Sequence, residues 1–134
     1  MIVDTGILVA LADRADRNHR AAAAVFSLPE PKIVPEPVVV EADWMILKYL
    51  GVTTEIAFLK SVCGGQMAVE SSNAEDRERA AVLVERYADA EIGYVDGVVV
   101  AVAERLRERR VATLDRRHFS LVVPRHAPAF EILP

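Results

Sequence analysis

The chain has 134 residues, of which 52% are hydrophobic and 27% are charged, and its formal net charge is −4. This length and apolar content fit one domain with a sizeable core, spanning residues 1–134, and argue against a disordered chain. The negative charge argues against a simple electrostatic nucleic-acid binder. It is compatible with an enzyme whose acidic site is neutralised by a metal ion.

The cysteine content and the apolar runs indicate in which cellular compartment the protein is expected. Cys63 is the only cysteine, which excludes an internal disulfide and a zinc site built on clustered cysteines, and we expect a buried, inert thiol. The first residues lack the positive segment of a signal peptide. The most apolar later run, residues 95–103, is too short to span a bilayer. We therefore expect a cytoplasmic protein without a membrane anchor.

Strand-like and helix-like segments alternate along the chain. The expected strands are residues 1–3, 32–34, 66–69, 111–114 and 130–133. The expected helices are residues 5–12, 18–28, 38–50, 55–62, 74–88 and 96–109. Such alternation predicts an α/β fold in which a parallel sheet is flanked by helices on both faces.

Several element boundaries carry their own signals. Gly51 is expected to end the helix 38–50, and Thr53 or Thr54 to cap the helix that follows. Ser72 or Asn73 is expected to cap the charged helix 74–88. The arginines near residue 109 suit the C-terminal end of a helix, where the dipole favours cations.

Four carboxylates lie in apolar surroundings near the ends of predicted elements. Asp4 follows the first strand, and Asp115 directly follows the strand 111–114. Glu41 and Asp96 lie near the starts of two apolar helices. Ligands of open α/β sheets bind at the carboxyl ends of the strands, so we expect these four side chains to form one site.

Each carboxylate also has a purely structural interpretation. Asp4 and Asp96 are in positions where Asp commonly caps a helix. Asp115 fits the start of a turn, and Glu41 fits the open side of its helix. Taken one at a time, these interpretations are at least as good as a catalytic one. Four together are harder to explain, because charged groups are rarely buried unless they are paired or bound to metal.

Converging carboxylates imply a particular chemistry. They repel one another unless a divalent cation lies between them, and an all-oxygen ligand set suits Mg²⁺ or Mn²⁺. Hydrolysis of a phosphodiester is the natural reaction of such a site. An aspartyl-phosphate mechanism is disfavoured, because Gly6 occupies the place of its second Asp. Neither G-x-x-x-x-G-K-[ST] nor G-x-G-x-x-G is present.

Four stretches of the chain, taken in order, form one pattern. They are Ile2-Val3-Asp4-Thr5-Gly6, Glu41 in the helix after a proline, Tyr94-Val95-Asp96-Gly97 with Ala101 and Ala103-Glu104-Arg105-Leu106 after it, and Ala112-Thr113-Leu114-Asp115-Arg116-Arg117-His118-Phe119. In this order they resemble the PIN domain family, and especially the VapC toxins of bacterial toxin–antitoxin pairs. No single segment is specific, but the ordered set covers nearly the whole chain. Gly97 is a departure, since many relatives have alanine there.

The resemblance implies a Rossmann-like sheet and a metal-dependent ribonuclease. The acidic positions of the family fall on Asp4, Glu41, Asp96 and Asp115, which would hold the metal and help to orient a water. Thr113 matches a small hydroxyl position that supports the site. The sequence thus predicts a Mg²⁺-dependent endoribonuclease toxin of a type II toxin–antitoxin system. The alternatives are another metal-dependent phosphohydrolase and a catalytically silent PIN-like binding module.

The resemblance also implies partners, namely a VapB-like antitoxin and a second copy in a homodimer. Trp44, Tyr49 and Phe58 lie in the two middle helices, where a partner surface is expected, although core packing is the commoner role of such residues.

Three residues after Asp115 are further candidates. Arg116 and Arg117 are suited to RNA phosphates, or else form a solvated turn. His118 is either a proton shuttle or a structural histidine beside Phe119, and the second interpretation is favoured.

Overall fold

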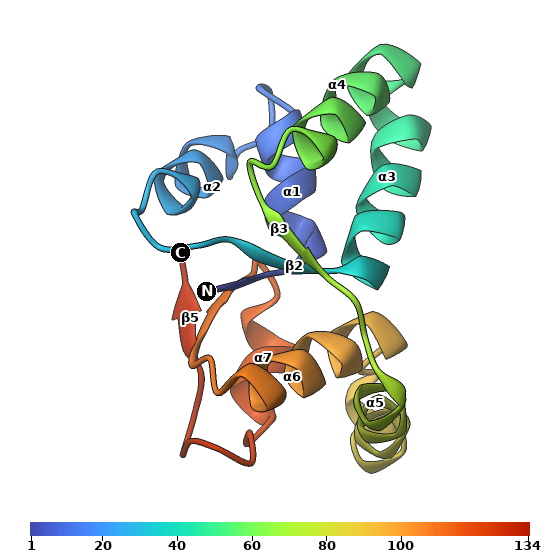
Figure 1. Ribbon diagram of the computed structural model, residues 1–134, viewed down its shortest axis with the longest axis vertical. Coiled ribbons are helices and arrows are strands. Elements are labelled where there is room, and N and C mark those ends of the chain that lie inside the picture. The colour runs from blue at the N-terminus through green and yellow to red at the C-terminus, as the bar shows by residue number, and fades with distance from the viewer.

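The computed structural model describes residues 1–134, and its framework is a parallel sheet with the strand order β3-β2-β1-β4-β5 (Figure 1). The strands are β1 (Ile2–Val3), β2 (Ile33–Pro35), β3 (Ala68–Glu70), β4 (Arg110–Ala112) and β5 (Glu131–Leu133). Ile2 at the centre pairs with Ile33 on one side and Val111 on the other. The predicted α/β class and parallel sheet are confirmed.

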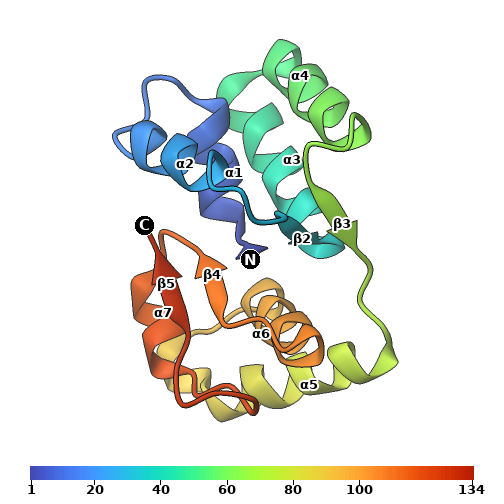
Figure 2. The same cartoon turned by 60° about the vertical axis from the view of Figure 1, so that its left-hand side comes forward.

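Helices cover both faces of this sheet. They are α1 (Thr5–Ala12), α2 (His19–Phe26), α3 (Glu36–Leu50), α4 (Val52–Cys63), α5 (Ala74–Arg86), α6 (Tyr94–Leu106) and α7 (Arg116–Leu121), with a 3₁₀ turn η1 (Ala88–Ala90). Figure 2 shows α1 to α4 on one side of the strands and α5 to α7 on the other. None of these helices combines the length and apolar content that a membrane crossing requires.

The core lies between β1 and the helices packed on it. Ile2 and Val3 are fully buried, and so is most of α6, where every residue from Gly97 to Ala103 is inaccessible or nearly so. This burial explains why α6 is apolar around most of its circumference. A helix embedded in this way fixes the position of its own N-terminus against the sheet, which matters for the site described below.

The structure corrects several predicted boundaries. Gly51, with φ +85°, lies between α3 and α4 and flanks both, so neither Thr53 nor Thr54 caps α4. Only glycine adopts this left-handed conformation at little cost, and it allows two helices to be joined by one residue. Arg107 takes a left-handed φ of 54° and ends α6 earlier than predicted. The thiol of Cys63 is exposed, because α4 ends at the surface there.

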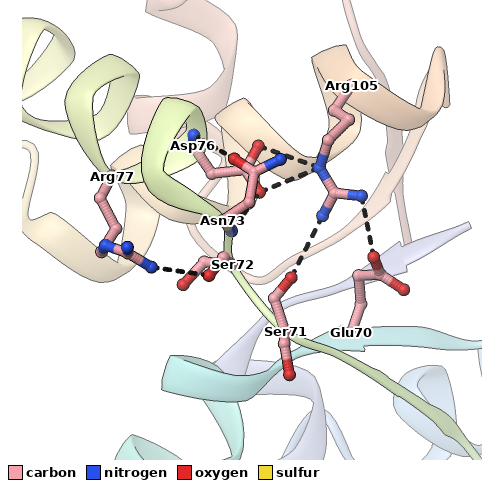
Figure 3. A network of polar contacts seen from close by, with 7 residues as sticks. All are labelled: Glu70, Ser71, Ser72, Asn73, Asp76, Arg77 and Arg105. Atoms are coloured by element: carbon pink, nitrogen blue, oxygen red, sulfur yellow. Dashed lines mark hydrogen bonds and ion pairs between the residues drawn. The ribbon is translucent and has the colours of Figure 1, made fainter.

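A polar network holds the only chain crossing between the two helical layers, which runs from β3 into α5 (Figure 3). Asn73 caps α5, as predicted, and shares reciprocal hydrogen bonds with Asp76. The buried Asp76 carboxylate also accepts from Nε of Arg105, at 2.9 and 3.1 Å. Arg105 donates further to Glu70 and to the carbonyl of Ser71. The end of α6 is thereby bonded to both sides of the crossing.

Gly97 allows α6 to lie unusually close to α5. A Cβ atom at this position would lie 3.0 Å from the carbonyl oxygen of Ala80 and 3.1 Å from its Cα. The absence of a side chain at Gly97, where many relatives have alanine, is therefore a packing requirement of this chain.

We expect Gly97→Ala to lower the free energy of unfolding by about 1–3 kcal/mol, because the added methyl forces two helical backbones apart. Chemical denaturation measures this change. Gly93→Ala is the comparison variant, since its Cβ would meet nothing closer than an Asp96 oxygen at 3.9 Å and it loses only the preference for glycine over alanine at the N-cap of α6. Equal stability of the two variants would contradict the close-packing account.

Candidate active site

Four carboxylates line one open hollow at the carboxyl edge of the sheet, with a volume of about 580 Å³. We call it the acidic hollow, and its carboxylates are Asp4, Glu41, Asp96 and Asp115. Asp4 and Asp115 are the N-cap residues of α1 and α7, Asp96 is in the first turn of α6, and Glu41 is in the second turn of α3. The positive ends of the α1, α6 and α7 dipoles therefore lie beside three of the acids and partly offset their repulsion. The predicted set does come together in space.

Asp4 is the most deeply buried of the four, with 6% of its surface exposed. It occupies the N-cap position of α1, but its side chain makes no capping hydrogen bond, so the cap interpretation is wrong. Thr113 instead donates its hydroxyl to Asp4 Oδ2 at 2.6 Å. Burial raises the pKa of Asp4 to about 6; the Thr113 hydrogen bond opposes this change, and the nearby charges of Asp96 and Glu41 add to it.

Thr113 joins two of the acids. Its buried hydroxyl donates to Asp4 and accepts from the backbone N–H of Asp115 at 2.9 Å. β4 ends at Ala112, one residue earlier than Thr113, so Asp115 does not directly follow the strand as predicted. The Thr113 N–H still donates to the carbonyl of Leu133 at 2.8 Å, so the backbone at Thr113 is held to β5 while its hydroxyl bonds the two acids. Thr113 thus lies where a supporting residue would act, and that role stays a prediction.

Thr5 holds Glu41 in the same manner. Its hydroxyl donates to Glu41 Oε2 at 2.5 Å, and Thr5 itself is 5% exposed. The sequence interpretation did not single out Thr5. A hydroxyl directly after the strand-end acid was the available signal. Since Thr5 is in the first turn of α1, the bond also fixes α3 relative to α1.

His118 lies between the other two acids. Its Nδ1 is 3.1 Å from Asp96 Oδ2 and 3.0 Å from Asp115 Oδ2. The favoured interpretation of a structural histidine beside Phe119 missed this contact. The signal was the three-residue spacing from Asp115, which places both residues on one turn of a helix.

Asp96 and Asp115 also have backbone partners. Asp115 caps the unpredicted helix α7 by accepting from the N–H of His118 at 3.0 Å, where a turn was the structural expectation. Asp96 is in the first turn of α6 and accepts from the N–H of Gly93 at 3.2 Å, so it is not the N-cap residue itself. Asp96 is thus hydrogen-bonded by Gly93 and by the His118 ring, and Asp115 is held by the His118 N–H with the same ring close to its other oxygen.

Two cations stand at the rim. Arg116 and Arg117 line the acidic hollow and are exposed. Arg116 also donates to the carbonyl of Pro134 near the end of the chain. Their position beside Asp115 is the one expected of phosphate contacts, although α7 replaces the predicted loop.

The middle aromatic residues divide into two groups. Phe58 is 7% exposed and belongs to the core, as expected of a large apolar side chain. Trp44 is 55% exposed and Tyr49 is 62% exposed, so core packing is the wrong interpretation for both. Both project from α3, whose buried side is occupied by Val38, Ala42 and Ile46.

Comparison with known proteins settles the family. The family model described as PIN domain matches residues 1–123. The chain belongs to the PIN domain family. A VapC-type PIN protein, "Ribonuclease VapC26" of Mycobacterium tuberculosis (strain ATCC 25618 / H37Rv), is 36% identical over 135 residues, covering 100% of both chains. The resemblance to VapC proteins is confirmed at this level.

Solved structures agree with this chain in fold. One is M. tuberculosis VapC20, titled a sarcin-ricin loop cleaving toxin, with a TM-score of 0.81 and 22% identity over 87% of this chain and 91% of that one. Another is a toxin–antitoxin complex from Klebsiella pneumoniae, with a TM-score of 0.68 and 19% identity over 97% and 98%. At these identities the likeness concerns the arrangement of the sheet and helices.

The donor chemistry of the PIN-domain site fits a hard divalent cation, since its acidic ligands offer only oxygen. No group of three or more His, Cys, Asp or Glu side chains is already arranged to hold an ion. The carboxylates instead contact neighbouring side chains, namely those of Thr113, Thr5 and His118. Mg²⁺ commonly takes only one or two carboxylates directly and keeps several waters, so a ready-made cage is not required. Burial raises the pKa of Asp4, and a bound cation would favour its charged form.

Proposed function

We propose that this protein is a Mg²⁺-dependent endoribonuclease toxin of a type II toxin–antitoxin system, with Mn²⁺ as an alternative ion. The observation that carries the proposal is the acidic hollow, where four carboxylates from four helices surround one opening at the sheet edge. The 36% identity to a protein named as a ribonuclease supports the choice of RNA as substrate.

In this proposal Asp4, Glu41, Asp96 and Asp115 hold the metal, either directly or through water. A bound divalent cation supplies a water of lowered pKa and stabilises the attacking and leaving oxygens. The contribution of the chain itself is orientation. The hydroxyls of Thr113 and Thr5 and the ring of His118 fix carboxylate oxygens before substrate arrives, which lowers the reorganisation needed for reaction.

Arg116 and Arg117 are proposed to contact the RNA backbone. Both line the acidic hollow, and guanidinium groups bind phosphate oxygens in a bidentate manner. Together with the bound cation they offset the negative charge of the site, which would otherwise repel RNA. The overall net charge of −4 makes this local compensation necessary.

The partners follow from the same assignment. We propose a VapB-like antitoxin and a homodimer in the cytoplasm, with no membrane partner. A solved structure of the same fold is titled a toxin–antitoxin complex, which supports the first proposal. Co-expression with the neighbouring upstream gene, scored for growth rescue and for a stable complex, tests it.

The metal requirement is tested by removing and restoring divalent ions. We expect RNA cleavage to be lost after chelation and to return with Mg²⁺ or Mn²⁺, because crowded carboxylates cannot bind a phosphodiester without a counter-charge. A gel assay with single-stranded RNA measures this result. Undiminished cleavage in excess chelator would contradict the proposed site.

The same assay separates the alternatives. Faster hydrolysis of DNA or of a small phosphate ester than of RNA would indicate a different phosphohydrolase. The absence of Mg²⁺ and Mn²⁺ binding by calorimetry, together with no hydrolysis of any substrate, would indicate a catalytically silent PIN-like binding module.

A further inference from the structure

A second hollow adjoins the acidic hollow and is not accounted for by metal chemistry. It has a volume of about 630 Å³ and is lined by Glu36, Pro37, Val40, Glu41, Trp44 and Val95. We call it the Trp44 groove. It lies between α3 and the start of α6, and Glu41 lines both hollows. A substrate that occupies the acidic hollow therefore has its next unit beside the Trp44 groove.

The chemistry of the groove differs from that of its neighbour. Pro37, Val40, Trp44 and Val95 give it apolar and aromatic walls. Its two acids lie on the first two turns of α3, and only Glu41 of the two also lines the acidic hollow. A phosphate would be repelled by Glu36 and Glu41. A flat, neutral group suits the remaining wall, where the indole of Trp44 is 55% exposed.

A cation accompanies the indole. Lys48 Nζ lies 4.5 Å from the ring centroid of Trp44 and 5.1 Å from that of Tyr49. The two rings themselves are 6.5 Å apart and nearly perpendicular. An exposed aromatic ring beside a lysine is the combination with which proteins bind single-stranded nucleic acids, since the ring stacks on a base and the cation contacts the backbone.

We propose that Trp44 stacks on a base of the RNA substrate, next to the nucleotide whose phosphate lies in the acidic hollow, and that Lys48 contacts the backbone there. This inference rests on the proposed ribonuclease function and adds a substrate-positioning residue to it. Since every base has a π face, Trp44 favours unpaired RNA over a duplex and contributes little to base identity.

A protein segment is the competing occupant. Val40, Trp44 and Leu47 are all exposed and recur at the spacing of one helix face, which would also suit an apolar partner helix. The groove favours RNA for two reasons. It opens toward the acidic hollow through Glu41, and its exposed ring carries a cation, which an apolar helix would have to displace or bury.

Trp44 is the only tryptophan of the chain, so its fluorescence reports on the groove directly. The test uses the Asp4→Asn protein, which is expected not to cleave RNA, in the presence of Mg²⁺ and titrated with a short single-stranded RNA. We expect saturable quenching, and no quenching by an abasic ribose-phosphate strand of the same length. RNA binding measured by anisotropy without any quenching would overturn the proposal.

Cleavage kinetics provide a second, independent test. We expect Trp44→Leu to raise KM for single-stranded RNA about tenfold with little change in kcat, the order that one base–aromatic stack supplies. Trp44→Phe should restore most of the affinity, because its ring can still stack. Val123→Ala, at a side chain that is 60% exposed and lines neither hollow, is the control.

The remaining outcomes are distinguishable. If wild-type protein cleaves RNA and Trp44→Leu has an unchanged KM, the inference fails while the proposed function stands. The same holds if Trp44→Leu loses only its complex with a co-expressed antitoxin, since the groove would then be a protein surface. If wild-type protein cleaves no RNA, the proposed function fails, and the fluorescence titration alone decides whether Trp44 binds a base.

Discussion

Replacing Asp4 with asparagine is expected to remove RNA cleavage and, at the same time, to make the protein more stable. The loss of activity should be roughly a thousandfold or more, since metal-assisted hydrolysis depends on several kcal/mol of charge stabilisation. The gain in stability follows from burial, because Asn can accept the Thr113 hydrogen bond without placing a charge at a side chain that is only 6% exposed. A residue kept only for the fold would show the opposite pattern.

The raised pKa of Asp4 also predicts how the free energy of unfolding changes with pH. The pKa of Asp4 is raised from 3.8 to about 6, so between these values the folded state binds more protons than the unfolded state. Wild-type stability from this group therefore falls as pH rises from about 4 to about 6, and it stays lower above that range. The full difference corresponds to roughly 3 kcal/mol at neutral pH without divalent ions. Asp4→Asn should lack this fall.

Urea unfolding in chelator at pH 4.5 and pH 7.5 measures the difference between the two proteins. Asp89→Asn, at an exposed acid outside the acidic hollow, is the matched control and should change neither activity nor stability. Adding Mg²⁺ should stabilise wild-type protein more than Asp4→Asn. If Asp4→Asn cleaves RNA normally, or is less stable than wild type at pH 7.5, the proposed role of Asp4 is wrong.

The sequence was sufficient to predict the sheet and the meeting of four acids, because both depend on local patterns. The apolar runs 1–3 and 111–114 are followed by Asp4 and Asp115, which indicated where two strands end. Parallel strands bring such ends to one edge of the sheet. What could not be predicted were contacts set by tertiary packing. The bridge from His118 to Asp96 joins residues 22 positions apart and depends on how α6 and α7 dock.

The exposure of individual aromatic residues could not be predicted from the sequence either. The two middle helices carry three large aromatic residues, Trp44, Tyr49 and Phe58. Only Phe58 is buried. The difference depends on which side of α3 and of α4 packs against the rest of the protein. Both helices have apolar residues on several sides, so periodicity alone does not show which side is buried. Likewise, the position of Asp76 in the first turn of α5 gives no sign of its contact with Arg105, which is 29 residues away in the sequence.

The ion pair between Asp76 and Arg105 is expected to contribute strongly to stability. We expect Asp76→Ala to lower the free energy of unfolding by about 3 kcal/mol, the sum expected for a lost helix cap bond and charge-assisted bonds to Arg105. Asp76 is 3% exposed and accepts from Arg105 Nε and from the N–H of Asn73, so alanine leaves both donors short of an acceptor. Thermal or chemical denaturation measures the loss.

Asp76→Asn separates the two contributions, since it keeps an oxygen for Asn73 and removes the charge that faces Arg105. We expect it to lose roughly half of what alanine loses, because the cap and the charge contribute comparable amounts. Pairing each variant with Arg105→Gln in a double-mutant cycle then gives the coupling energy directly. RNA cleavage well below the unfolding temperature should be unchanged, because the network joins β3, α5 and α6 away from the acidic hollow. A cleavage defect in folded Asp76→Asn would show that the crossing also positions Asp96 at the other end of α6.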